Sequence, residues 1–234
     1  MWEFLDKVVY INLDHREDRR KIMEKLFQEG QIPSEKVHRF SAVKHRYGII
    51  GTALSHIGVI ELAKQQGWNR ILILEDDMTW NDFESNYKKL EELVATPKWD
   101  VCMLGGLYMR TTPPKINTAL WTNGYIVQSH YYDTLSQNYK EGVYLKLNKK
   151  IPIKTFRTPE ILKQALIDEM VYADHIHNID AYWIKLQIKD NWIGVIPKMI
   201  KQVPSWSDLL NGFVDRELEV PDINSWYAYI MERL

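Results

Sequence analysis

The sequence predicts an α/β fold in which a mostly parallel central sheet is flanked by helices. Four large apolar residues follow one another from Ile71 to Leu74 without polar alternation, which is typical of a strand buried on both faces. Other β-branched segments alternate with segments of helical periodicity, as in βα units. The chain of 234 residues is long enough for one such domain. We expect it over residues 1–212, with 213–234 as a C-terminal tail that can be helical and pack on it.

Strands are expected where β-branched and aromatic residues cluster between turn signals, at residues 7–13, 37–43, 70–74, 99–107, 120–129 and 192–200. Pro197 favours an edge position for the last of them. Apolar periodicity and cap signals predict helices at residues 17–29, 53–66, 82–94 and 131–140, from Thr158, from Asn178, and at 226–233. Loops are expected at 110–115, at 204–208 and over the lysine-rich segment 141–157.

Composition argues against several classes of partner and compartment, although a local basic patch could still exist. The 30 basic and 31 acidic residues give a net charge of -1, which offers no basic excess for a nucleic acid. The single cysteine, Cys102, excludes an internal disulfide and favours a reducing compartment. Acidic residues in 1–6 interrupt the apolar core of a signal peptide, and no apolar run has the length of a membrane span. We expect a cytoplasmic protein.

Three consecutive carboxylates, Glu75, Asp76 and Asp77, follow the apolar strand directly. Open α/β sheets bind their ligands at the carboxyl ends of strands. Three adjacent acids repel one another and are costly to desolvate unless a cation or hydrogen-bond donors compensate them. Oxygen ligands of this kind suit magnesium or manganese. The alternative is a solvated acidic turn, and the tripeptide alone does not distinguish the two.

A second polar group opens the first predicted helix. Asn12, Asp14, Arg16, Arg19 and Arg20 lie at the end of the first strand and in the turn and helix start after it. Arginines and backbone amides near a helix N-terminus suit a nucleotide diphosphate. The alternative interpretation is a solvated helix surface with ordinary ion pairs. Ser55 and His56, expected in the first turn of the helix 53–66, could reach a ligand, although a first-turn serine is also a common capping residue.

Three ordered segments, residues 9–20, 51–56 and 71–77, resemble glycosyltransferase family 25, the lipopolysaccharide-type glycosyltransferases. Their order and spacing match over about residues 7–80. Residues 123–127, 178–183 and 203–208 are similar in a looser way. The resemblance implies a GT-A-like, Rossmann-type domain that moves a hexose, galactose or glucose, from a UDP-sugar to a glycan or glycoconjugate acceptor. It also implies manganese or magnesium as cofactor and inversion of the anomeric centre.

The resemblance gives the polar residues roles. Asp77 would bind the metal directly, and Glu75 would bind through water or orient the site. Because the two alternate along the backbone, we expect them on the same side of an extended segment. The Glu-Asp-Asp order departs from a strict Asp-x-Asp, so the role of Glu75 as the first metal ligand is left undecided. The nucleotide sugar would be held by Asn12, Asp14, Arg16, Arg20 and Asp76 and bordered by Ser55 and His56.

Inversion requires a general base for the acceptor hydroxyl, and the resemblance implies Asp180 for it. The alternative is that Asp180 stabilises a helix N-terminus without catalysis. His175 and His177 could add a metal ligand or could simply lie at a helix end. The expected partners are a nucleotide-sugar donor and a glycan acceptor, and a lipid-linked acceptor would bring the protein to a membrane surface.

Three other classes of protein are alternatives to this interpretation. An inactive module with the same fold could bind a nucleotide sugar or a carbohydrate, although the intact acidic triplet argues against it. A nucleotidyltransferase would consume a nucleoside triphosphate instead. A phosphorylation receiver domain would carry its acid pair after the first strand, where this chain has Asp14-His15-Arg16.

Overall fold

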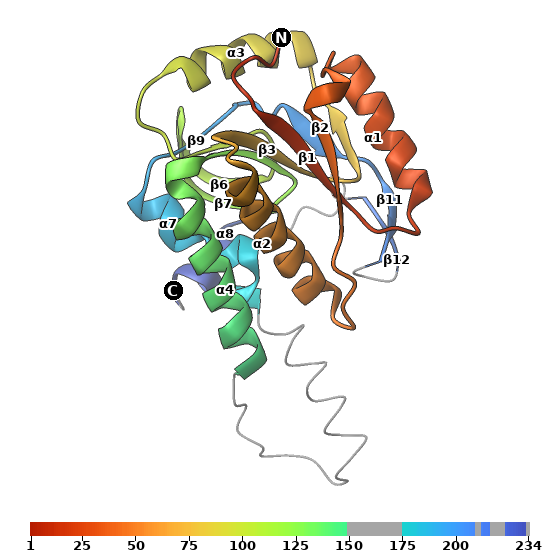
Figure 1. Ribbon diagram of the computed structural model, residues 1–234. Helices are drawn as coiled ribbons and strands as arrows, with labels where there is room; N and C mark the ends of the chain where they lie inside the picture. The colour runs from red at the N-terminus through yellow and green to blue at the C-terminus, as the bar shows by residue number, and fades with distance from the viewer. Residues whose placement is uncertain (149–174, 209–211, 216–222, 233–234) are drawn as a thin grey trace, which may run out of the picture.

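The computed structural model describes residues 1–148, 175–208, 212–215 and 223–232. The helix expected from Thr158 and most of the loop expected at 141–157 therefore lie outside the described residues. The described part is an α/β arrangement around one large sheet, with the N-terminus packed beside α3 (Figure 1).

The central sheet has eight strands in the order β2-β1-β3-β8-β5-β9-β7-β6. β1 pairs in parallel with both β2 and β3, and β5 pairs in parallel with β9. β8 is antiparallel to β3 and β5, and β7 is antiparallel to β9 and β6. All strands of this described sheet except β7 and β8 thus point the same way, which confirms the mostly parallel sheet. The strands are β1 Lys7–Asn12, β2 Val37–Ser41, β3 Arg70–Glu75, β5 Val101–Met103, β6 Leu107–Thr112, β7 Lys115–Leu120, β8 Gly124–Gln128 and β9 Trp192–Gly194.

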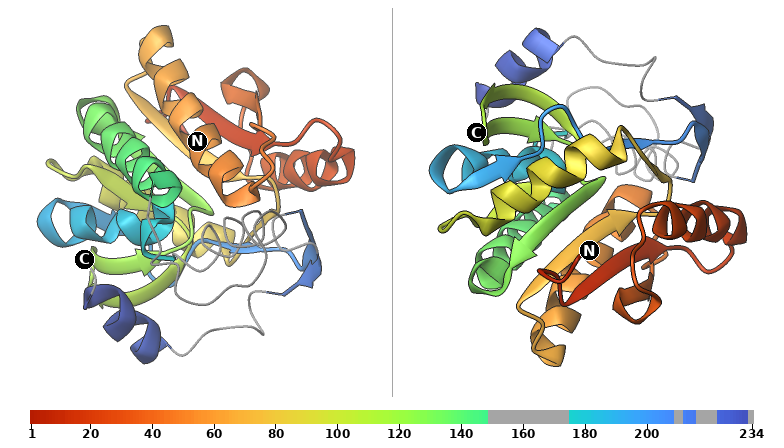
Figure 2. Two further views of the ribbon diagram at one scale, coloured as in Figure 1. Left: turned by 90° about the horizontal axis from the view of Figure 1, so that it is seen from below. Right: turned by 90° about the horizontal axis from the view of Figure 1, so that it is seen from above.

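Helices cover both faces of the sheet (Figure 2). One face packs against α1 (Glu17–Glu29) and α3 (Phe83–Ala95), and the other packs against α2 (Gly48–Gln66) and α4 (Tyr132–Asn148). The alternation along β3 explains its unbroken apolar sequence. Ile71 and Ile73 enter the core on the α2 side, while Leu72 and Leu74 enter the core on the α1 side. Both pairs are fully buried.

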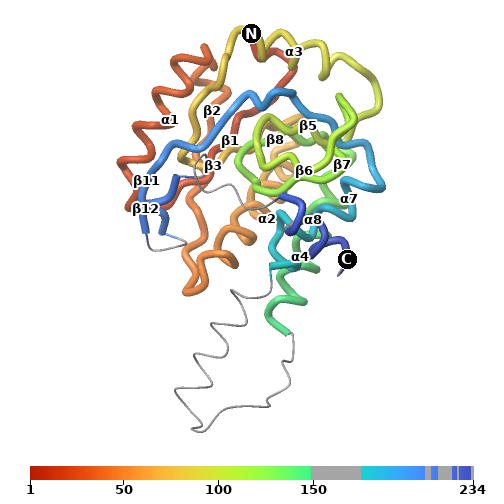
Figure 3. Tube along the Cα trace, turned by 180° about the vertical axis from the view of Figure 1, so that it is seen from behind, coloured from red at the N-terminus to blue at the C-terminus, as the bar shows by residue number. Residues whose placement is uncertain are grey.

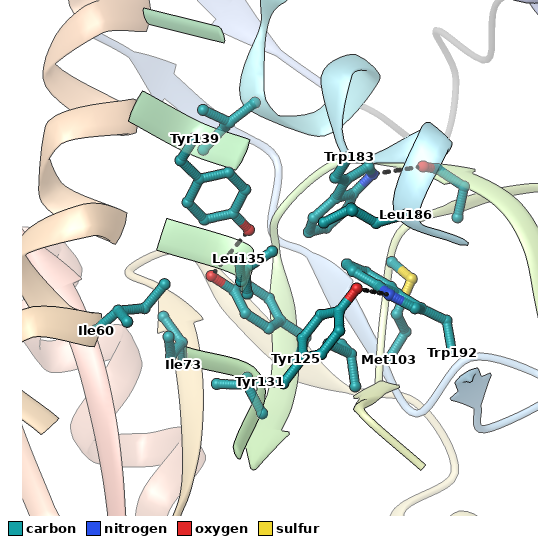
Figure 4. Close-up of a cluster of buried hydrophobic side chains, with 14 of the residues drawn as sticks. Ile60, Ile73, Met103, Tyr125, Tyr131, Leu135, Tyr139, Trp183, Leu186 and Trp192 are labelled. Atoms are coloured by element: carbon teal, nitrogen blue, oxygen red, sulfur yellow. Dashed lines mark hydrogen bonds between the residues drawn. The ribbon is translucent and has the colours of Figure 1, made fainter. Parts of the chain in front are cut away.

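The aromatic residues serve mainly as core. Trp183 and Trp192 are fully buried with Tyr125 and Tyr139 between the sheet and α4 (Figure 4). The hydroxyl of Tyr139 donates to that of Tyr125 at 3.2 Å. The indole Nε1 of Trp192 donates to the hydroxyl of Tyr131 at 3.2 Å, so these polar atoms are paired within the core.

Smaller elements complete the fold, and the tube in Figure 3 shows the C-terminal hairpin beside the N-terminal end of α1. β4 (Met78–Trp80) pairs with β10 (Ile200–Gln202), and β11 (Ser205–Ser207) pairs with β12 (Gly212–Val214). The remaining helices are α6 Ile179–Tyr182, α7 Ile184–Lys189 and α8 Ile223–Met231, with the short 3-10 helices η1 Ser34–Lys36, η2 Ser129–Tyr131 and η3 His175–His177. The division at residues 212 and 213 stays a prediction.

Several expected boundaries are wrong. α2 begins at Gly48 and not at Ala53, so Gly51 lies inside the helix. A Cβ at Gly51 would lie 2.5 Å from the carbonyl oxygen of Val43, so the glycine is there for close packing and does not break the helix. The expected loop 110–115 is instead the turn of the β6–β7 hairpin. The expected strand 99–107 divides at Gly106, whose φ of 137° ends the extended conformation.

The C-terminal strand assignments also change. The expected strand 192–200 is two strands, β9 and β10, with Pro197 between them. β9 lies between β5 and β7 and is therefore not an edge strand. α4 extends eight residues further than expected, to Asn148. The expected loop 204–208 contains β11.

In the part of the chain that the structure describes, no helix is long and apolar enough to cross a lipid bilayer.

Candidate active site

The acidic triplet lies where two neighbouring parallel strands end. β1 and β3 are paired so that Ile11 is opposite Glu75, and each strand then leaves the sheet. The side chain of Asn12 consequently meets the residue after Glu75: its Nδ2 donates to Asp76 Oδ2 at 2.7 Å. The sheet register therefore brings the two polar groups of the sequence together at one edge, as expected for a ligand site in an open α/β sheet.

We call Asn12, Arg19, Asp76, Asp77 and Gln202 the aspartate cluster. Arg19 on α1 places Nη1 2.7 Å from Asp76 Oδ1 and 3.1 Å from Asp77 Oδ2. Gln202 Nε2 donates to Asp77 Oδ2 at 2.7 Å. Gln202 reaches this position because β10 pairs with β4, and because Val203 N donates to the carbonyl oxygen of Asp77. All charged members are largely buried.

The aspartate cluster has fewer positive than negative charges. When ionised, Asp76 and Asp77 carry two negative charges against the single positive charge of Arg19. Burial raises the pKa of Asp77 to about 7 despite the opposing effect of Arg19, and burial also raises the pKa of Asp76. Asp77 Oδ1 and Arg19 Nε are buried without a hydrogen-bond partner among the described residues. A ligand that supplies a cation to one and an acceptor to the other would complete the cluster.

Glu75 belongs to a second group, which we call the Glu75 cluster: His56, Glu75, Thr122, Tyr125 and Asp180. Thr122 Oγ1 donates to Glu75 Oε1 at 2.6 Å. His56 Nε2 lies 3.9 Å from the same oxygen, an ion-pair distance and not a hydrogen bond. Its Nδ1 lies 2.9 Å from the hydroxyl of Tyr125. Burial acts to raise the pKa of Glu75, but His56 and Thr122 outweigh it and the pKa is lowered.

Asp180 lies in the first turn of α6, beside Glu75. Its Oδ2 accepts a hydrogen bond from Trp121 N at 3.2 Å. Burial raises the pKa of Asp180, and the negative charge of Glu75 raises it further. The two carboxylates therefore differ: Glu75 holds its charge, while Asp180 binds a proton more readily. His175 and His177 lie nearby in the chain, in η3.

The predicted nucleotide-binding residues Asn12, Asp14 and Arg20 gather at the end of β1, together with Arg39 and Ser41, which were not predicted. Asn12 Oδ1 accepts hydrogen bonds at 3.0 Å from both Arg20 Nε and Arg39 Nε. Asp14 accepts from Ser41 Oγ at 2.8 Å and from Arg39. Hydrogen bonds from Arg39 and Ser41 lower the pKa of Asp14. These residues form a polar surface next to the aspartate cluster.

Two predicted residues have structural partners. Arg16 binds Asp18 through Nε and Nη2, and through Nη1 it binds Asp208 and the carbonyl oxygen of Trp206. It thus ties β11 to α1 and does not point at the acidic triplet. Ser55 Oγ donates to the carbonyl oxygen of Gly51 at 2.7 Å and accepts from Val43 N at 2.8 Å.

Two expectations about orientation are wrong. Ser55 and His56 are not in the first turn of their helix, since α2 begins at Gly48. Glu75 and Asp77 do not point to the same side: Glu75 meets Thr122, whereas Asp77 meets Arg19 and Gln202. The strand ends at Glu75 and Asp76 begins a turn, so the two-residue alternation of an extended segment no longer applies.

The aspartate cluster fits a divalent ion only in combination with another ligand. Among the residues that the structure describes, no group of three or more His, Cys, Asp or Glu side chains is arranged to hold a metal. Asp76 and Asp77 could supply two carboxylates, and the unpaired Asp77 Oδ1 is an available ligand atom. Magnesium is often bound in this way, by one or two carboxylates plus substrate phosphates.

Arg39, Thr122 and Gln202 were not predicted as site residues, and Arg19 was not predicted to contact the acidic triplet. Arg19 was among the arginines near the helix start that suit a nucleotide diphosphate, but nothing in the sequence placed it against the acids. Arg39 could have been found from β2, since parallel neighbours end at the same edge. Thr122 and Gln202 come from distant segments and have no local signal.

The sequence is similar to part of a viral protein. The chain is 32% identical to a protein of Acanthamoeba polyphaga mimivirus named "Putative glycosyltransferase R655", over 42% of this chain and 37% of the viral protein. The match thus spans well under half of that relative. No family model matches the chain.

Two solved structures show a distant likeness. One is a glycosyltransferase involved in the glycosylation of the major capsid of PBCV-1, with a TM-score of 0.44, 12% identity and 80% of each chain covered. The other is a mannose-1-phosphate geranyltransferase from Thermus thermophilus, with a TM-score of 0.43, 12% identity, and 86% of this chain and 76% of that chain covered. Likeness at this level carries no functional argument.

Proposed function

We propose that the protein is a metal-dependent glycosyltransferase that moves a hexose, galactose or glucose, from a UDP-sugar to a glycan or glycoconjugate acceptor with inversion. The observation that carries the proposal is the aspartate cluster. At the ends of β1 and β3, two buried aspartates exceed the charge of Arg19, and one carboxylate oxygen, Asp77 Oδ1, is unpaired. The sequence similarity to a viral protein named as a glycosyltransferase supports the same class.

The donor would lie over the carboxyl ends of β1 and β3. Asn12, Asp14 and Arg20 already form a hydrogen-bonded surface there, and Asp76 joins it through Asn12. Arg16 would border the nucleotide while holding β11. His56 would act through Glu75, and Ser55 would support the backbone behind the donor.

Manganese or magnesium would be held by Asp77 with Asp76, and Glu75 would orient the site from the other side of the strand end. When bound, the ion would stabilise the negative charge that collects on the departing diphosphate. The protein contributes a buried position in which that charge is poorly screened by water.

Asp180 is the proposed general base for the acceptor hydroxyl. Burial and the charge of Glu75 raise its pKa, which brings its proton affinity closer to what base catalysis near neutral pH requires. The hydrogen bond from Trp121 N orients the carboxylate. Glu75, which remains ionised, would keep Asp180 basic without taking the proton itself.

The test is release of UDP from UDP-galactose and UDP-glucose with manganese, with and without acceptor glycans. We expect Asp77→Ala to lose activity by about 100-fold or more, because it removes charge stabilisation of the leaving group. Asp133→Ala is the matched control, since Asp133 is exposed on α4 and pairs with Lys64.

Three outcomes separate the alternatives. Metal-dependent UDP release that disappears in Asp77→Ala supports the transferase. Nucleotide-sugar binding without turnover would instead identify an inactive binding module. Absence of both turnover and metal-dependent nucleotide binding would exclude the proposal.

A further inference from the structure

Arg19 joins three parts of the molecule through one guanidinium group. It projects from the first turn of α1, and its Nη1 contacts both Asp76 and Asp77. Its Nη2 donates to Ser205 Oγ at 3.0 Å and to the carbonyl oxygen of Trp206 at 2.9 Å, both on β11. The side chain is only 12% exposed. Arg19 therefore occupies the place of a counter-cation between the two aspartates.

This arrangement leaves two complementary atoms unsatisfied. Arg19 Nε, a donor, and Asp77 Oδ1, an acceptor, are both buried without a partner among the described residues. Unpaired buried polar atoms are costly, so a ligand that pairs both at once gains more than one that pairs either alone. A metal ion alone would satisfy Asp77 and would be repelled by the guanidinium. A phosphate alone would satisfy Arg19 and would be repelled by the aspartates.

We propose that Arg19 makes metal binding conditional on a nucleotide diphosphate. Without nucleotide, the guanidinium neutralises Asp76 and Asp77 and weakens their affinity for a divalent ion. A diphosphate offers Arg19 an anionic partner of its own, which frees the aspartates for the metal. The site would thereby discriminate against free metal and against ligands without a diphosphate. The inference rests on the proposed function, because it assumes a nucleotide-diphosphate donor.

The main alternative is that Arg19 only ties β11 to α1. Arg16 provides the matched control for this role. It also binds the carbonyl oxygen of Trp206, at 3.0 Å, but its guanidinium pairs with Asp18 and Asp208 and not with Asp76 or Asp77. Arg16→Gln therefore loosens the same hairpin and removes the same charge without changing the counter-cation of the aspartates.

The experiment measures manganese affinity by electron paramagnetic resonance of the free ion, for the full chain alone, with uridine and with UDP. Wild type should bind manganese weakly alone or with uridine, and much more tightly with UDP. Arg19→Gln should bind manganese alone about tenfold or more tightly than wild type, because a repelling charge is gone. It should also lose most of the gain from UDP. Arg16→Gln should match wild type in the manganese titration without nucleotide.

Two results would overturn the inference. Manganese affinity of Arg19→Gln equal to that of wild type would show that Arg19 does not compete with the ion. Equal increases in affinity for manganese without nucleotide in Arg16→Gln and Arg19→Gln would assign the effect to the hairpin. Failure of the wild type to bind manganese and UDP together would remove the proposed function as well, whereas coupled binding with no effect of Arg19→Gln would remove only the role of Arg19.

A second variant keeps the test decisive if Arg19→Gln does not fold. Arg19→Lys retains the charge but lacks Nε and the forked donor group. It should keep weak binding of manganese alone and lose part of the coupling between manganese and UDP. Affinity for manganese without nucleotide that rises in Arg19→Lys as much as is expected for Arg19→Gln would overturn the proposal, because the repelling charge is still present.

Discussion

At the scale of single residues, the three carboxylates of the acidic triplet lie in two different environments. Alternation along β3 directs Glu75 to the α2 side, where Thr122 and His56 hold it ionised. The turn that follows directs Asp76 and Asp77 to Arg19 on the α1 side. Glu75 and Asp77, two residues apart, thus differ in partners because the strand ends at Glu75 and its alternation stops there. Asp77 is the member whose charge the fold compensates least.

Asp77 should lower the stability of the metal-free protein at neutral and alkaline pH. Its pKa rises from 3.8 to about 7, so the folded state binds the proton more tightly than the unfolded chain does. The stabilising effect of the proton is complete at pH values below about 4 and is lost as the pH rises through about 7. Asp77→Asn should therefore raise the free energy of unfolding by about 2–4 kcal/mol near pH 8, and by less near pH 5.

Urea unfolding in the presence of a chelator measures this effect. Asp133→Asn, at an exposed position, serves as the control and should change stability little at either pH. A gain for Asp77→Asn that is equal near pH 5 and pH 8, or a loss near pH 8, would contradict the assignment. A variant that is more stable and yet inactive is the signature of a residue kept for function.

At the scale of elements, the pairing of β4 with β10 positions Gln202 in the aspartate cluster. It brings Gln202 opposite Met78, one residue beyond Asp77. Ile200 of the same strand packs directly on Gly124 of β8, where a Cβ would lie 2.2 Å from Ile200 Cδ1 and 2.8 Å from Leu74 Cδ2. The absence of a side chain at Gly124 therefore lets β10 approach the sheet.

Gly124→Ala should push Ile200 outward and displace Gln202 from Asp77. We expect a loss of about 1–3 kcal/mol in the free energy of unfolding, which is usual for overpacking, together with weaker binding of manganese and UDP. Thermal melting and the manganese titration measure the two effects. Adding Ile200→Val, which removes the clashing Cδ1, should restore part of both.

Gly67→Ala separates stability from site geometry. Gly67 ends α2 with a φ of 68° and has open space around its Cβ position. An alanine there should cost about 1 kcal/mol of backbone strain and leave manganese and UDP binding unchanged. If Gly124→Ala behaves in the same way, β10 does not position the site.

At the scale of the whole molecule, a bound donor should stabilise the fold by mass action. With manganese present and UDP at about 100 times its dissociation constant, the free energy of unfolding should rise by about 2.7 kcal/mol. For a domain of this size that corresponds to an increase in Tm of roughly 5–10 °C. Differential scanning calorimetry measures it, and uridine with manganese should give almost no shift. A shift produced by free sugars without nucleotide would favour a carbohydrate-binding module.

The sequence by itself determined the α/β class, the buried strand β3, the limits of α1, and the position of three acids at a strand end. These features depend on local periodicity and on the polarity of neighbouring residues, which are present in any short window. Local patterns misplaced the start of α2 and the β6–β7 hairpin. Gly51 and the Pro113-Pro114 pair are typical of breaks in the chain, whereas close packing and strand pairing decided the outcome.

Only the tertiary structure decided which partners the acids have. Gln202 lies 125 residues from Asp77 in the sequence, and Thr122 lies 47 residues from Glu75. Asp180 comes near Glu75 only because α6 packs beside β7 and because Trp121 N anchors the carboxylate. Sheet order and strand register bring these residues together. Both depend on packing between segments that are distant in the sequence, and the local sequence of one segment does not indicate its partner. The physical reason is that the pKa of a carboxylate depends on its surroundings in space and not on its neighbours in the chain.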